Sequence, residues 1–166
     1  PARHHRLDLT ERILRYEKQL EHRGLALRDE LRDCHRNVIG LLRVLGRQPG
    51  NTVLCHNDLL RANRIVSGGK LWALDWEYCA MGSPWYDIAV VINGDSLPAP
   101  DADALLEAYL QRAPRAGERD TLHQYGCIYR YLELLWYLAL DKPALGPAAL
   151  EEKSAVLLTM LAERSS

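Results

Sequence analysis

A short segment near the middle of the chain spaces a histidine, an acid and an amide in a pattern that suits one kind of chemistry. Residues 56–63 read HNDLLRAN, which contains His56, Asp58 and Asn63, and a second acid, Asp75, ends a short apolar run farther along. The H-x-D-x-x-x-x-N form is that of a kinase catalytic loop, and kinases hold magnesium with one more acid placed like Asp75. The spacing therefore predicts transfer of a phosphoryl group.

The chemistry gives each of these side chains a role. Moving the γ-phosphoryl group of ATP needs positioning and neutralisation of charge more than covalent help. We predict that Asp58 accepts the proton of the acceptor hydroxyl. Asn63 and Asp75 would present oxygens to Mg²⁺, a hard cation that prefers oxygen ligands. His56 would brace the loop, and ATP and Mg²⁺ are the expected cofactors.

Short strands frame this loop. Residues 53–55 before it and 64–66 after it are mostly apolar, and Ser-Gly-Gly-Lys at 67–70 predicts a hairpin turn into the apolar run 71–74. Because Asp75 follows that run directly, loop, hairpin and carboxylate would form one compact constellation. The alternative is a polar loop whose spacing is accidental.

The stretch from Leu54 to Asn93 resembles the aminoglycoside phosphotransferase and choline kinase superfamily, and within it looks most like bacterial choline or thiamine kinase-type enzymes. The resemblance assigns His56, Asp58 and Asn63 to the family's catalytic loop. It makes Asp75 the counterpart of the aspartate in the kinase D-F-G motif. The fold it implies is α+β and mainly α-helical: the C-terminal lobe of a protein-kinase-like fold, with a small β-hairpin carrying the catalytic loop.

A second family pattern lies at residues 82–89, GSPWYDIA. By resemblance, Asp87 stands at the start of a helix and holds the catalytic loop through hydrogen bonds rather than touching substrate. An acid in a first helical turn after a proline is also favoured by the helix dipole. That argument alone leaves Asp87 as an ordinary helix-terminus residue.

The acceptor is expected to be a small-molecule alcohol. Tyr129, Glu133 and Trp136 share one face of a predicted helix over 119–140, and aromatic rings attract an ammonium group by about 0.5–2 kcal/mol each. By resemblance to choline kinases, which carry such aromatics on C-terminal helices, this face would bind choline; the alternative is that it is bundle core. Trp76 and Glu77, directly after the metal aspartate, would line the acceptor side.

Other readings stay open. Tryptophan at 76, where the family often has phenylalanine, leaves thiamine, ethanolamine, an amino sugar or a homoserine-like alcohol as acceptors. An aminoglycoside-type phosphotransferase would need an acid-lined pocket, and the available acids also suit helix caps and solvated faces: Asp101, Asp103, Glu107, Glu118 and Asp120. A non-catalytic kinase-like binding module is the remaining alternative, although the base and both metal ligands are intact.

Composition bounds the class of protein. The chain has 166 residues, 48% hydrophobic and 26% charged, which is enough for one domain with a real core. A net charge of −1 argues against a nucleic-acid surface, and no apolar run is long enough for a membrane span. With no leader-like segment and no paired cysteine spacing, we expect a cytosolic protein whose cysteines are small core side chains.

The remaining chain is predicted to be mostly helical around one small sheet. We expect two leading helices in residues 1–50, the catalytic and metal-binding core in 51–95 and a helical subdomain in 96–166. The predicted helices are 10–22, 27–45, 84–91, 102–111 with Asp101 as its cap, 119–140 and 147–162.

A nucleotide-clamping lobe is not recognisable in this sequence. No G-x-G-x-x-G and no strand-borne lysine precede His56, and the chain starts with proline rather than methionine. We therefore expect the C-terminal lobe of a kinase whose N-terminal lobe is missing. Alone it would bind ATP weakly and turn over little.

Overall fold

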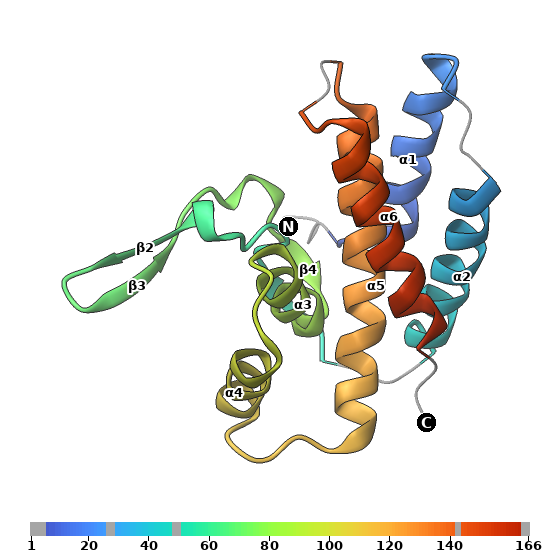
Figure 1. Cartoon of the computed structure of the whole chain (residues 1–166). Coiled ribbons are helices and arrows are strands. Elements are labelled where there is room, and N and C mark those ends of the chain that lie inside the picture. The colour runs from blue at the N-terminus through green and yellow to red at the C-terminus, as the bar shows by residue number, and fades with distance from the viewer. Residues whose placement is uncertain (1–5, 26–28, 48–50, 142–143, 164–166) are drawn as a thin grey trace. The chain divides into compact units, whose positions relative to one another are not determined.

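The structure is a computed structural model, and it describes residues 6–25, 29–47, 51–141 and 144–163. It separates into two compact units, each built from stretches that are distant in sequence: unit 1 is Pro1–Leu7 with Pro49–Gly126, and unit 2 is Asp8–Gln48 with Cys127–Ser166. Most described residues are helical, with two small antiparallel sheets, which confirms the predicted α+β, mainly α-helical class (Figure 1).

Unit 2 is helical. It contains α1 (Leu9–His22), α2 (Asp29–Leu45), α6 (Pro147–Ala162) and the second half of α5 (Ala116–Ala139). Asp8 caps α1, because its Oδ1 accepts a hydrogen bond of 3.0 Å from Glu11 N. The predicted helices 10–22 and 147–162 are confirmed; for the helix predicted over 27–45, residues 27 and 28 lie outside the described residues.

The core of unit 2 follows the helical spacing of its apolar residues. Ile13, Val38, Leu135 and Leu157 are fully buried, and each such side chain contributes about 1.5–3 kcal/mol relative to exposure. Polar contacts also enter this core: Tyr131 Oη donates to Glu17 Oε1 at 2.7 Å, and His35 Nδ1 lies 2.6 Å from the same oxygen. Burial, more than the neighbouring carboxylate, raises the pKa of Tyr131 above its usual range.

Unit 1 carries the strands. Strand β1 (Val53–Cys55) pairs antiparallel with β4 (Ala80–Gly82), and β2 (Arg64–Ser67) pairs with β3 (Lys70–Ala73) in a separate two-stranded sheet. The predicted hairpin is confirmed: Gly68 and Gly69 have φ angles of 58° and 72°, and a two-residue type I′ turn requires positive φ at both positions. Strand β4 was not predicted, because three residues of Ala-Met-Gly carry no strand pattern. The expectation of one small sheet is therefore wrong: the described residues form two.

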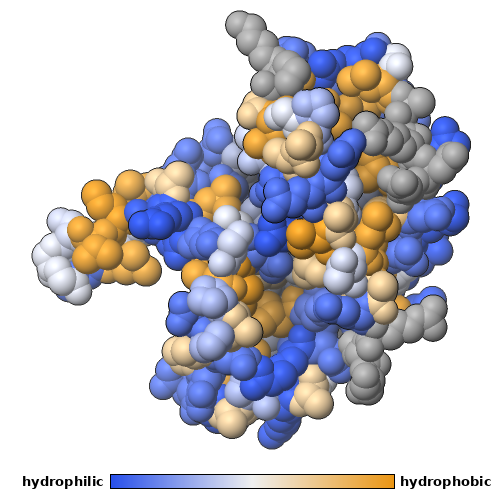
Figure 2. Space-filling model, in the orientation of Figure 1, coloured by the Kyte–Doolittle hydropathy of each residue, from blue (hydrophilic) through white to orange (hydrophobic). Residues whose placement is uncertain are grey.

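The hairpin β2–β3 extends away from the other elements of unit 1 and is unusually apolar on its surface. Figure 2 shows apolar surface along it, and the side chains of Ile65, Val66, Leu71 and Trp72 are between 48% and 73% exposed. Contiguous apolar surface of this kind is uncommon on single soluble units.

Helices α3 (Pro84–Gly94) and α4 (Ala99–Leu110) complete unit 1 together with the first half of α5. Helix α3 runs three residues past its predicted end at Val91. The predicted capping role of Asp101 is wrong: α4 already begins at Ala99 with Pro98 as its N-cap, and Asp101 lies in the first turn. Proline at 100 fits that turn because its fixed φ suits the start of a helix.

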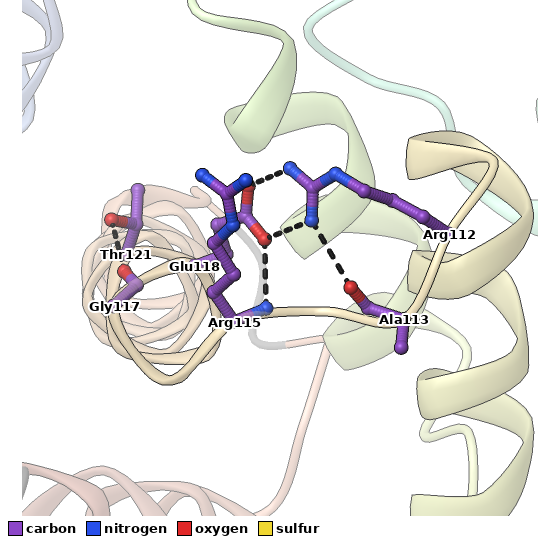
Figure 3. A network of polar contacts seen from close by, with 6 residues as sticks. All are labelled: Arg112, Ala113, Arg115, Gly117, Glu118 and Thr121. Carbon is purple, nitrogen blue, oxygen red and sulfur yellow. Dashed lines mark hydrogen bonds and ion pairs between the residues drawn. The ribbon is translucent and has the colours of Figure 1, made fainter.

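Helix α5 also starts earlier than predicted, at Ala116 instead of 119, because Glu118 caps it (Figure 3). The Glu118 carboxylate accepts 2.8 Å hydrogen bonds from Arg115 N and from the Arg112 guanidinium, and the latter is the main reason why its pKa is lowered to about 2. Thr121 Oγ1 donates to Gly117 O in the next turn. None of the described helices is long and apolar enough to cross a membrane.

Candidate active site

The segment predicted as a catalytic loop starts directly after β1. His56 and Asn57 are each only 2% exposed, and Asn57 has a φ angle of 64°, a left-handed conformation that asparagine tolerates better than most residues. Asn57 Nδ2 donates to Tyr78 O at 2.9 Å. Asn57 is not among the residues predicted to act, although a residue type tolerant of positive φ between His56 and Asp58 is a signal for a sharp turn.

Asp87 holds the start of this loop. It lies in the first turn of α3, and its carboxylate accepts 2.7 Å hydrogen bonds from both His56 N and Asn57 N. Hydrogen bonds to a charged acceptor are stronger than neutral ones, and the N-terminus of a helix favours the negative charge. The two backbone amides that lead into Asp58 are therefore fixed by one side chain.

His56 connects the loop to the end of the hairpin. Its Nε2 lies 2.7 Å from Leu74 O, and because a carbonyl oxygen only accepts, the hydrogen must be on Nε2. The imidazole also packs on Trp76, with ring centroids 4.8 Å apart. His56 Nδ1 is buried and has no hydrogen-bond partner among the described residues. His56 thus ties the residue before Asp75 to the residues before Asp58.

Asp58 and Asn63, the predicted base and one predicted metal ligand, touch each other. Asn63 Nδ2 donates to Asp58 Oδ2 at 2.9 Å and to Asp58 O at 2.8 Å. Asn63 ends the short 3-10 helix η1 (Arg61–Asn63), and its backbone oxygen accepts a 2.8 Å hydrogen bond from Leu74 N. Because the amide nitrogen of Asn63 points to Asp58, the amide oxygen Oδ1 points away from that carboxylate.

Asp75 follows Leu74 immediately and is exposed. Its backbone is left-handed (φ 59°), and its carboxylate makes no capping hydrogen bond to the 3-10 helix η2 (Trp76–Tyr78) that it precedes. Among the described residues no group of three or more histidine, cysteine, aspartate and glutamate side chains could hold a metal. Two carboxylates and one amide supplemented by water are oxygen donors of the kind that Mg²⁺ accepts, so the donor types of Asp58, Asn63 and Asp75 suit that ion.

Trp76 and Glu77, predicted for the acceptor side, are both exposed on η2. Trp76 has two structural contacts: its ring packs on His56, and its Nε1 donates to Ala73 O at 3.0 Å. One face of the indole is therefore used to hold the loop, while 46% of the residue remains open to solvent.

Tyr129, Glu133 and Trp136 belong to unit 2, so the structure describes them apart from the loop in unit 1. Tyr129 is buried and Trp136 is exposed, with its ring against Tyr137 at 4.8 Å between centroids. Their part in acceptor binding stays a prediction.

Glu133 already has a cation of the chain beside it. Lys153 Nζ lies 3.0 Å from Glu133 Oε2 and 5.1 Å from the centre of the Tyr137 ring, and Arg130 lies 3.5 Å from the same oxygen. A carboxylate and an aromatic ring in unit 2 therefore do hold an ammonium group, but it is that of Lys153. An external cation would have to replace or share this position.

An apolar pocket of about 270 Å³ lies in unit 1 behind β1. Its walls include Leu54, Leu59, Ile88 and Tyr109, and Asp87 is its one acidic lining residue. Both Asp87 oxygens accept backbone hydrogen bonds, so the pocket offers little to a polar ligand. It is separate in character from the group of Asp58, Asn63 and Asp75.

The chain is similar in sequence and in fold to known proteins. The chain is 34% identical over 87 residues to Protein LicA of Haemophilus influenzae, a match that covers 51% of this chain and 33% of that protein. A choline/ethanolamine kinase family protein from Mesorhizobium loti superposes with a TM-score of 0.85 at 27% identity, over 96% of this chain and 56% of that one.

Two further solved structures share the fold. They are choline kinase LicA from Streptococcus pneumoniae, with a TM-score of 0.79 at 20% identity over 96% of this chain and 57% of that one, and an ADP-bound aminoglycoside phosphotransferase, with a TM-score of 0.55 at 18% identity over 93% and 52%. The chain thus spans about a third of the curated relative and somewhat more than half of the solved ones. The model of the Phosphotransferase enzyme family matches residues 1–124, and the chain belongs to this family.

Proposed function

We propose that this chain carries the base and the metal ligands of an ATP-dependent phosphotransferase that moves the γ-phosphoryl group to the hydroxyl of a small molecule. The observation that supports this best is the contact between Asp58 and Asn63 on a loop whose start is held by Asp87. A carboxylate and an amide at this spacing, fixed from the backbone, suit base and metal ligand in phosphoryl transfer.

In this proposal the side chains divide the work. Asp58 accepts the proton of the acceptor hydroxyl as the oxygen attacks phosphorus. Asn63, through Oδ1, and Asp75 hold Mg²⁺, which when bound neutralises charge on the phosphate oxygens. His56 keeps the two acids on adjoining segments through Leu74, and Asp87 keeps the approach to Asp58 rigid.

We propose choline or a related amino alcohol, or thiamine, as the acceptor. The similarity to a choline/ethanolamine kinase family protein and to LicA supports an amino alcohol, and the exposed Trp76 and Glu77 beside Asp75 suit a cationic group. Tyr129, Glu133 and Trp136 remain proposed contributors. The pairing of Glu133 with Lys153 weakens the case for a free carboxylate on that face.

An aminoglycoside acceptor is less well supported. Of the acids that could have lined a polycation pocket, Glu118 caps α5 and pairs with Arg112, and Asp103 pairs with Arg119. Each of these two acids therefore has an arginine partner, and each lies on a helix surface as a cap or ion-pair partner.

We also propose that a separate lobe supplies the contacts that clamp ATP, and that the 166-residue chain alone turns over slowly. The test compares this chain with a longer polypeptide that includes the corresponding lobe. ATP consumption is measured with choline, ethanolamine, thiamine and an aminoglycoside as acceptors. Equal and robust rates for the two polypeptides would overturn the need for a second lobe.

Asp58→Asn is the mechanistic test. It keeps the volume of the side chain but removes the proton acceptor, and loss of a general base costs roughly 10²–10⁴-fold in kcat. The matched control is Asp103→Asn, which removes an equal charge from an exposed ion pair of unit 1. The test uses the longer polypeptide. There, retention of wild-type kcat by Asp58→Asn, or absence of phosphoryl transfer to any of the four acceptors, would refute the proposed function.

A further inference from the structure

A second acid, Asp95, lies at the opposite end of α3 from Asp87. Its Oδ1 accepts a 3.1 Å hydrogen bond from Arg61 N, and its Oδ2 forms an ion pair with the Arg64 guanidinium. Arg64 Nε in turn lies 3.3 Å from Leu60 O. The side chains of Asp95 and Arg64 are only 10% and 19% exposed, so the pair is largely removed from solvent.

The position of Asp95 is not explained by the helix itself. Asp95 is the C-cap directly after α3, where the helix dipole disfavours a negative charge, whereas Asp87 lies in the first turn, where the charge is favoured. The unfavourable interaction of the Asp95 carboxylate with the helix dipole is offset by Arg64, the residue directly after the catalytic loop. The contacts of Asp95 thus join the end of α3 to the residues that end the catalytic loop.

We propose that Asp95 and Arg64 are positioning residues that fix the second half of the catalytic loop so that Asn63 meets Asp58. Two acids then bind the loop at points about 12 Å apart along the axis of α3. Asp87 binds residues 56–57, and Asp95, with Arg64, binds residues 60–64. This inference rests on the proposed function, because it assigns the pair's purpose to a metal ligand.

The contacts around Asn63 show how the pair would act. Asn63 N donates to Leu60 O at 2.9 Å, which closes the turn η1. The pair holds the start of this turn, since Arg64 Nε donates to Leu60 O and Asp95 accepts from Arg61 N. Arg64 itself follows the end of the turn, so its side chain links that end back to the start. Without the ion pair we expect the backbone of η1 to change its orientation, so that Asn63 Nδ2 no longer donates to the Asp58 carboxylate.

The experiment uses the 166-residue chain with Mn²⁺ as a probe for the metal and two readouts. Mn²⁺ affinity is measured by electron paramagnetic resonance, and the side-chain amide signal of Asn63, assigned with Asn63→Ser, is followed by NMR without metal. Asp95→Asn is expected to weaken Mn²⁺ binding by about 10-fold, as loss of a residue supporting a metal ligand commonly does, and to shift the Asn63 signal. Asp103→Asn, which breaks the ion pair with Arg119, should change neither readout.

The outcomes separate this inference from the proposed function. If wild type binds Mn²⁺ and Asp95→Asn leaves both readouts unchanged, the positioning role is wrong and the proposed function stands. If wild type does not bind Mn²⁺, or binds it in a way that Asp75→Asn does not weaken, the proposed metal site fails. The Asn63 amide signal then decides the positioning role: a shift in Asp95→Asn supports it, and no shift overturns it. Should Asp95→Asn not fold, Arg64→Lys, which keeps the charge but loses the Nε contact, is judged by the same readouts.

Discussion

At the scale of single residues, the contact that sets the loop is the double hydrogen bond to Asp87. Asp87→Asn replaces an acceptor oxygen by an NH₂ group that faces a backbone N–H, so one buried donor loses its partner. We expect the free energy of unfolding to fall by about 2–3 kcal/mol, because hydrogen bonds to charged groups contribute about 1.5–3 kcal/mol each. Urea denaturation measures the difference.

The control for that prediction is Asp103→Asn, since Asp103 is exposed and pairs only across the surface with Arg119. Exposed ion pairs contribute about 0–1 kcal/mol, so its loss should be smaller. Equal losses for the two variants would mean that Asp87 acts as an ordinary surface acid and does not anchor the loop.

The sequence pattern singled out some of the residues that form and hold the loop and missed others. Asp58, Asn63 and Asp87 stand in the spaced patterns on which the resemblance rests. In the structure Asn63 contacts Asp58, and Asp87 binds the two backbone amides that precede Asp58. Asn57 and Asp95 have no such pattern, because their roles depend on a backbone angle and on an ion pair across 31 residues. An acid at the unfavourable end of a helix is the one local signal that pointed to Asp95.

At the scale of elements, the hairpin that carries Asp75 depends on its two-glycine turn. Gly69 has a φ angle of 72°, so Gly69→Ala should destabilise unit 1 by about 1–2 kcal/mol, the cost of a left-handed L-residue. The measurement is the free energy of unfolding by denaturant, read from tryptophan fluorescence, to which Trp72 on the same hairpin contributes.

Gly117→Ala is the matched control with the opposite sign. Gly117 lies in the first turn of α5, and a Cβ there would meet no atom within 4 Å. Alanine at a helical position is more favourable than glycine by up to about 1 kcal/mol, so this variant should be stabilised. A stabilised Gly69→Ala variant would contradict the assigned turn.

Element boundaries were predictable where a local signal marks them. Pro84 and Pro147 start α3 and α6 as expected, because proline suits a first helical turn. The early starts of α4 and α5 were missed. Pro98 precedes α4 and Glu118 contacts Arg115 before α5, and in both places the sequence reads as a loop.

At the scale of the whole molecule, burial protects the thiols. It raises the pKa of Cys55 to about 11 and of Cys127 to about 12, and Asp87 adds to the effect at Cys55. At pH 8 we expect a thiol reagent to label Cys79, the half-buried cysteine, before the buried Cys34, Cys55 and Cys127, with the sites read by mass spectrometry. Fast labelling of Cys55 in folded protein would contradict the burial.

The same shifts give a pH dependence. A thiol whose pKa is raised by folding contributes its stability fully below its unfolded pKa of about 9. That stability is lost as the pH rises through the folded values of about 11 and 12. The free energy of unfolding should therefore decline from pH 9 upward, and less so in Cys55→Ser, as measured by denaturation at several pH values.

Which helices pack together was beyond the sequence pattern. Periodicity predicted α1 and α6 closely, but unit 2 is formed by early and late helices, as in the 3.2 Å contact of Gln19 Nε2 with Ala139 O. Such contacts join residues more than a hundred positions apart, and apolar spacing along one helix does not specify its neighbour.

The left-handed backbone at Asp75 limits which amino acids can occupy that position. Branched side chains would be strained there, whereas glycine and asparagine accept the angle but bring no carboxylate. In a library of every substitution at position 75, we expect the variants that fail to fold to carry branched side chains. The variants that fold but lack activity should carry glycine or asparagine. One position would thus separate the requirements of the fold from those of the proposed phosphoryl transfer.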